Sequence, residues 1–280
     1  MKPRSALPDD VVGLKRPNAP GDSNAAPAPR PETDDPAVLA QVPGVGRLLF
    51  AAFVAAAVLA TTGSTLGWLG LYYAAKPAAM LLAMGFVLVR ARSAGGLRRF
   101  DALLLAALAG SLAGDVFLML PGNYFIPGLA SFLLAHLCYI ALLRQDAPWF
   151  SSRAGLLTPL GFGALMYAAL WSGLPDPVLR GAVAAYVLVI GLMAAQAVGR
   201  ASVLRNRRAQ LVALGACIFM LSDTLIAINR FLQPVPLSAL WILSTYYLAQ
   251  VLIVVNAREA STTYPAPPLI HPRQGGSGAP

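Results

Sequence analysis

The sequence is divided into long apolar blocks, and this division constrains the fold more than any other feature. Each block has about 18 to 22 residues, the helix length that crosses a bilayer core of about 30 Å. Strands of a membrane barrel would instead alternate over about ten residues. The chain is therefore predicted to be an all-α polytopic membrane protein with eight transmembrane helices. They cover residues 46–63, 71–90, 102–120, 125–143, 154–172, 178–198, 209–230 and 237–256.

Composition agrees with a membrane protein and argues against other classes. The chain is 57% hydrophobic and 12% charged, about half the charged fraction of an ordinary soluble domain. The net charge of +9 does not predict a nucleic-acid partner, because the arginines lie in short loops and form no basic face. Cys138 and Cys217 fall inside apolar blocks and show neither a disulfide framework nor metal-ligand spacing.

The chain is predicted to have three parts. Residues 1–44 are rich in Pro, Ala and Asp and are expected to form a disordered cytoplasmic tail. Residues 45–257 form the eight-helix membrane domain, and residues 258–280 form a second disordered cytoplasmic tail. The sequence predicts no oligomeric state.

The distribution of arginine predicts the orientation in the membrane. If the N-terminus is cytoplasmic, nearly all loop arginines fall on the cytoplasmic side, as the positive-inside rule requires. These arginines are Arg47, Arg90, Arg92, Arg98, Arg99, Arg144, Arg153, Arg200, Arg205, Arg207 and Arg208. The opposite side holds Arg180 and Arg230. We expect an integral protein of a bacterial cytoplasmic membrane, with both termini cytoplasmic and the lipid bilayer as its surroundings.

Two aspartates lie inside apolar blocks, where an ionised carboxylate is costly unless it is paired or protonated. Asp115 and Asp223 each lie about 20 Å along helices that run in the same direction, so they are predicted to share one depth. Lys76 is expected at a similar level, near the outer rim. Asn229 and Arg230 continue the helix face of Asp223 toward its outer end. These residues are therefore candidates for one intramembrane site.

Three further polar residues are predicted to line the same cavity. His136 and Tyr139 lie three apart on one helix face, and Tyr247 lies on the last helix. Each has a structural alternative: helix–helix hydrogen bonding for the histidine, and packing for the tyrosines. Lys76 and Arg230 have the alternatives of snorkelling and interface anchoring. His136 alone does not make a metal site, and the chemistry considered below requires no metal or other cofactor.

A weak internal match indicates a parallel repeat of four helices. A shift of 108 residues places Asp115 on Asp223 and Tyr139 on Tyr247. Chance matching between apolar blocks is the alternative explanation, because such blocks align easily.

Paired carboxylates in a dry cavity cannot easily both ionise, so they share a proton as acid–base chemistry requires. They serve hydrolysis of an acetal-like bond, peptide hydrolysis, or proton- or cation-coupled transport. Leu112 and Ser222 depart from the pattern of intramembrane aspartyl proteases. Proline and glycine mark mostly loops, which disfavours the broken helices of transporters. A non-catalytic lipid-binding protein is a further alternative, and residue spacing does not choose among these functions.

Two motifs carry a resemblance to a known family. The first motif begins at Gly114-Asp115 and continues through Phe117-Leu118-Met119-Leu120-Pro121, Phe125, Gly128, Phe132, Ala135-His136 and Tyr139. The second is Ser222-Asp223 followed by Leu225, Ala227 and Asn229-Arg230-Phe231, and Lys76-Pro77 also fits. Over roughly residues 46–256 the chain resembles the lysoplasmalogenase-like (YhhN-type) integral membrane proteins.

The resemblance implies a membrane hydrolase that acts on a lysophospholipid substrate. Such an enzyme cleaves the vinyl ether bond of lysoplasmalogens to a fatty aldehyde and glycerophosphoethanolamine or glycerophosphocholine. Asp115 and Asp223 would be its catalytic carboxylates. One would protonate the β-carbon while the other stabilises the oxocarbenium ion and positions water. Lys76, Asn229 and Arg230 are expected to hold the phosphate head group.

Overall fold

The computed structural model describes residues 42–259, and these residues form eight long α-helices. All eight are long and apolar enough to cross a membrane, so the predicted all-α fold with eight spans is confirmed. The predicted tails fall almost entirely in residues 1–41 and 260–280, which lie outside the described residues. The helices are α1 (Gly44–Thr65), α2 (Leu69–Ser93), α3 (Arg99–Met119), α4 (Phe125–Leu143), α5 (Arg153–Leu170), α6 (Pro177–Leu204), α7 (Arg207–Phe231) and α8 (Ser238–Asn256), with a 3₁₀ turn, η2 (Trp171–Gly173), after α5.

The predicted boundaries agree with the helices to within a few residues, except at the end of α6. This helix continues past the predicted residue 198 to Leu204, because Arg200 does not interrupt it. The Arg200 guanidinium is buried in a two-point contact with Asp146, with both N–O distances 2.6 Å. The helix ends where Arg205 adopts a left-handed backbone conformation, with φ of 51°. Arg200, the charge at which the predicted apolar block ended, is therefore neutralised by Asp146.

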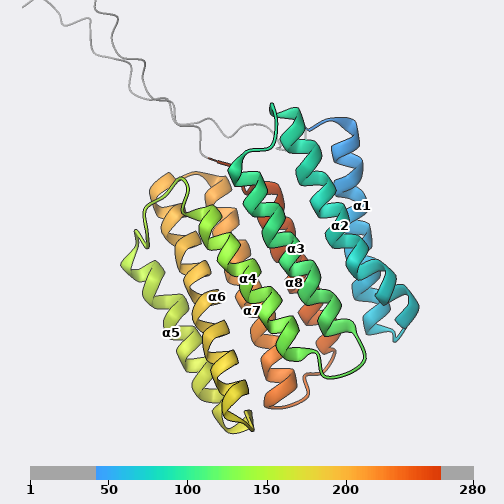
Figure 1. Ribbon diagram of the computed structural model, residues 1–280, viewed down its shortest axis with the longest axis vertical. Helices are drawn as coiled ribbons and strands as arrows, with labels where there is room; N and C mark the ends of the chain where they lie inside the picture. The colour runs from blue at the N-terminus through green and yellow to red at the C-terminus, as the bar shows by residue number, and fades with distance from the viewer. Residues whose placement is uncertain (1–41, 260–280) are drawn as a thin grey trace, which may run out of the picture. The chain divides into compact units, whose positions relative to one another are not determined.

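Helices that follow one another in the sequence pack side by side within each set of four. Thus α1, α2, α3 and α4 pack in order, as do α5, α6, α7 and α8. The two sets meet where α4 packs on α6 and α1 packs on α8. Figure 1 shows α3, α4, α7 and α8 in the middle, with α1 and α2 on one flank and α5 and α6 on the other. The same packing order in both sets is compatible with the four-helix repeat, which stays a prediction, as does the orientation in the membrane.

Close packing of α3 against α4 depends on Gly114, the residue before Asp115. A Cβ at this position would overlap the ring of Phe132 on α4. At Gly110, one turn earlier, a Cβ would lie 3.1 Å from the backbone nitrogen of Ala135. The small residue in the first motif therefore allows the ring of Phe132 to pack against the backbone of α3 at the residue before the buried aspartate.

We predict that Gly114→Ala lowers the free energy of unfolding by about 1–3 kcal/mol, because the added methyl overpacks the α3–α4 contact. Gly161→Ala on α5 is the matched control, since nothing lies within 4 Å of the position its Cβ would take. Reversible unfolding of the purified protein in mixed micelles measures both. Equal stability of the two variants would contradict the steric role of Gly114.

Candidate active site

Asp115 is enclosed by polar side chains from two other helices. Its Oδ1 lies 3.2 Å from Nζ of Lys76 on α2. The hydroxyl of Tyr246 on α8 donates to its Oδ2 at 2.7 Å. Asp115 is 3% exposed and Lys76 is 5% exposed, so both side chains lie in the interior of the bundle. The ion pair neutralises both charges inside the bundle.

Asp223 has different partners, from α6 and α4. The hydroxyl of Tyr186 on α6 donates to Asp223 Oδ2. Nε2 of His136 lies 2.9 Å from the same hydroxyl oxygen and 3.6 Å from Asp223 Oδ2. His136 is fully buried, and its Nδ1 has no hydrogen-bond partner among the described residues. Histidine, tyrosine and aspartate thus form a connected chain of groups that can hold and pass a proton.

An aromatic block stands between the surroundings of the two carboxylates. It consists of Phe132, Phe219 and Tyr246, whose rings meet edge to face at centroid distances of 5.4–6.3 Å. Tyr246 reaches Asp115 through its hydroxyl, while the ring of His136 lies 4.9 Å from that of Phe219. The structure therefore places the two carboxylates in two adjoining polar environments, with different partners.

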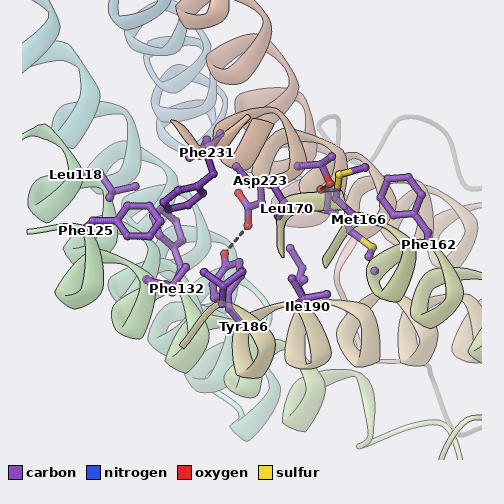
Figure 2. A pocket seen from close by; sticks show the side chains of 18 residues that line it. Leu118, Phe125, Phe132, Phe162, Met166, Leu170, Tyr186, Ile190, Asp223 and Phe231 are labelled. Atoms are coloured by element: carbon purple, nitrogen blue, oxygen red, sulfur yellow. Dashed lines mark hydrogen bonds between the residues drawn. The ribbon is translucent and has the colours of Figure 1, made fainter. Parts of the chain in front are cut away.

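Asp223 opens onto an apolar cavity between α4, α5, α6 and α7 (Figure 2). The space around the lining side chains, including the part that opens outward, is about 690 Å³. Asp223, Tyr186 and Thr224 are the polar residues of a lining that is otherwise apolar or glycine, and Asp115 is not part of it. The other lining residues are Leu118, Phe125, Leu129, Phe132, Phe162, Gly163, Met166, Leu170, Val183, Val187, Ile190, Met220, Ile226, Ala227 and Phe231. Such a cavity suits a hydrocarbon chain whose polar end meets the carboxylate.

The other residues predicted for the site do not line this cavity. The Tyr139 hydroxyl donates to Oε1 of Gln250 at 3.0 Å, and the buried Tyr247 hydroxyl has no hydrogen-bond partner among residues 42–259. Asn229 Oδ1 accepts from the backbone nitrogen of Val235 and so holds the α7–α8 loop. The guanidinium of Arg230 lies over the ring of Phe125, at 4.3 Å from its centroid.

Two tyrosines that bind the carboxylates were not predicted as site residues. Tyr186 lies within a continuous apolar block, and a hydroxyl in a membrane helix is a signal that could have found it. Tyr246 stands next to Tyr247, and the sequence does not show which of two neighbours faces Asp115. Both assignments depend on helix rotation, which hydrophobic periodicity does not determine when a helix is apolar on all sides.

These features define a polytopic helical membrane protein with two carboxyl groups inside its bundle, one of which lines an apolar cavity. Residues 71–257, which include both aspartates, match the model of the YhhN family. The chain belongs to this family, and the resemblance seen in its two aspartate motifs is confirmed.

Curated relatives of the chain include mammalian and bacterial proteins. It is 34% identical to lysoplasmalogenase TMEM86B of Sus scrofa, over 71% of this chain and 79% of that protein. It is 35% identical to lysoplasmalogenase TMEM86A of Homo sapiens, over 56% of this chain and 65% of that protein. It is 31% identical to a lysoplasmalogenase of Mycobacterium bovis, over 66% of this chain and 72% of that protein. No solved structure matches the chain.

We predict that Lys76→Met lowers the free energy of unfolding by about 3–5 kcal/mol, because it leaves Asp115 buried without a counter-charge. Combining it with Asp115→Leu should recover part of this loss, since no charge then remains in the interior. Unfolding of the two single variants and the double variant measures the coupling.

The exposed ion pair between Arg98 and Glu259 provides the control for this experiment. Its side chains are 67% and 43% exposed, so Glu259→Gln should change stability by less than about 1 kcal/mol. If Lys76→Met changes the free energy of unfolding as little as Glu259→Gln does, the Lys76–Asp115 pair does not stabilise the bundle.

Proposed function

We propose that this protein hydrolyses the vinyl ether bond of lysoplasmalogens within the membrane. The observation that carries the proposal is a carboxyl group, Asp223, that faces an apolar cavity inside a YhhN-family bundle. A lysoplasmalogen has one long alkenyl chain, which the cavity suits, and one polar head group. Relatives named lysoplasmalogenases share about a third of their residues with the chain over the aligned regions.

The first chemical step uses the proton of Asp223. The carboxylic acid transfers it to the β-carbon of the vinyl ether, and the carbon next to the ether oxygen becomes an oxocarbenium ion. The carboxylate left on Asp223 stabilises this cation. Water then adds to the cationic carbon and returns a proton to the carboxylate. The hemiacetal breaks its bond to the glycerol oxygen, and an aldehyde and a glycerophospho-alcohol are released for one water consumed.

Tyr186 and His136 hold Asp223 in position for this step. The Tyr186 hydroxyl donates to the carboxyl oxygen, and His136 lies within hydrogen-bond distance of that hydroxyl. Tyr186 and His136 reach Asp223 from the side of α6 and α4. They therefore orient one carboxyl oxygen of Asp223 and leave this carboxyl group exposed to the cavity. The pair of ring groups can also move a proton during each catalytic cycle.

The two aspartates then have unequal roles. The side chain of Asp223 is 13% exposed and lines the cavity. Asp115 is paired with Lys76 and accepts from Tyr246, a member of the aromatic block that packs beside His136. In this proposal Asp223 reacts with the substrate, and Asp115, neutralised by Lys76, holds the wall of the site.

We expect Asp223→Asn to lower the rate of aldehyde release by about 10²–10⁴-fold, because the amide cannot deliver the proton. Its stability should stay near that of the wild type. Asp115→Asn should lower both activity and melting temperature, because Lys76 is then left without its partner. A purified Asp223→Asn protein with near wild-type turnover on a lysoplasmalogen would refute the proposed role.

The chemistry has its own controls. The saturated alkyl ether analogue lacks the carbon–carbon double bond that accepts the proton and should not be cleaved. In D₂O, the aldehyde trapped as it forms should carry deuterium on the carbon next to the carbonyl. In ¹⁸O water, the glycerol oxygen should stay unlabelled, because the broken bond lies on the alkenyl side of that oxygen. Label in the glycerophospho-alcohol would contradict the scheme.

We predict that Tyr186→Phe lowers turnover by about 10- to 100-fold, the loss expected for a hydrogen bond to a charged group. Tyr167→Phe is the matched control. Its hydroxyl donates to the backbone oxygen of Arg180 at 3.2 Å, and it does not line the cavity. Steady-state rates of the two variants measure the effect, and similar losses in both would argue against a specific role for Tyr186.

A further inference from the structure

A second cavity lies at one end of the bundle, beside the cavity of Asp223. It forms where the α3–α4 loop and the α5–α6 link meet the end of α7. The space within it is about 900 Å³, open to the surface. Its lining combines three polar or charged side chains with apolar ones, and we call it the polar cavity. The lining residues are Asn123, Phe125, Ile126, Gly173, Pro175, Asp176, Leu179, Arg230 and Phe231.

Two residues of opposite charge, Asp176 and Arg230, line this cavity. Arg230 rests over the rings of Phe125 and Phe231, at 4.3 and 5.8 Å from their centroids. Among residues 42–259 no ion pair engages its guanidinium, so its N–H donors are available to an anion. Asp176 caps α6 through Oδ1, which accepts from the backbone nitrogens of Val178 and Leu179. No hydrogen bond within that part of the chain uses its Oδ2.

The fold holds these two charges together through Gly173. A Cβ at Gly173 would collide with the backbone carbonyl of Phe231, so the α5–α6 link lies directly against the end of α7. Asp176 follows on that link, and Arg230 directly precedes Phe231. The glycine therefore fixes the carboxylate and the guanidinium on one cavity.

The polar cavity adjoins the site of the proposed reaction. Phe125 and Phe231 line both cavities, and their rings pack edge to face with centroids 5.4 Å apart. Arg230 lies seven residues after Asp223 on the same helix, which is about 10 Å along its axis. A glycerol unit separates the phosphate of a lysolipid from its ether oxygen, so a molecule of this kind can extend from Arg230 to Asp223.

We propose that this cavity is the specificity site for a zwitterionic head group, with Arg230 binding the phosphate and Asp176 binding the ammonium. The inference rests on the proposed function, because it takes the lysolipid substrate from it. Asn123, at the same cavity, offers an amide to the phosphate oxygens. Arg230 and Asp176 together form a clamp. This clamp selects a head group that carries both charges over one that carries the phosphate alone.

The test measures binding of non-cleavable ligands, so that it does not depend on hydrolysis. Alkyl ether lysolipids with a phosphoethanolamine, a phosphate monoester or a bare glycerol head compete with a fluorescent alkyl lysolipid for the protein in nanodiscs. We expect Arg230→Gln to weaken both phosphate-bearing ligands by about tenfold and to leave the bare glycerol unchanged. Asp176→Asn, which keeps a residue able to cap α6, should weaken phosphoethanolamine by about threefold and leave the monoester unchanged or tighter.

Arg180→Gln is the matched control at the same end of the bundle. Arg180 donates to the backbone oxygen of Leu174 and lies over Trp171, and it does not line the cavity. Its ratios of affinity among the three ligands should equal those of the wild type. The clamp is overturned if Arg230→Gln weakens the bare glycerol ligand equally, or if Asp176→Asn weakens the monoester as much as phosphoethanolamine. If the wild-type protein binds the ligands with this selectivity but releases no aldehyde, the proposed hydrolase function is refuted. The proposed head-group site is then still supported.

Discussion

A carboxylate can remain inside a membrane bundle only when another group neutralises or protonates it, and the ion pair between Lys76 and Asp115 meets this condition. The pair joins α2 to α3, and the hydroxyl of Tyr246 adds α8 to the same point. Tyr246 also belongs to the aromatic block, in which Phe219 packs against His136. The position of the groups around Asp223 therefore depends on a neutralised charge on the far side of that block.

The elements of this fold follow from hydrophobicity, which is why the sequence predicts them well. Each span must be apolar over the thickness of the bilayer, and this requirement is visible as a block in the sequence. The prediction failed at the end of α6, because burial of Arg200 depends on Asp146, which is 54 residues away. Long-range charge pairing leaves no local pattern, so no periodicity could have shown it.

The candidate site could be predicted only in part, for the same physical reason. Burying a charged group costs free energy, so Asp115, Asp223 and Lys76 stand out in apolar blocks even when the rotation of their helices is unknown. Their partners are tyrosines, which are common in membrane helices and carry no comparable cost. Tyr186 and Tyr246 acquire their roles from the rotation of α6 and α8, and packing against other helices sets that rotation. Packing likewise determines that Asp223 lines the cavity and that Asp115 does not.

The wall formed by Phe125 and Phe231, which the two cavities share, has a consequence for how a cleaved lipid would leave. Hydrolysis turns one amphiphile into two molecules of opposite solubility. In the proposed reaction the aldehyde would keep the long chain and stay with the apolar cavity. The glycerophospho-alcohol would lose its anchor and stay with the polar cavity. The two products would then separate without passing each other.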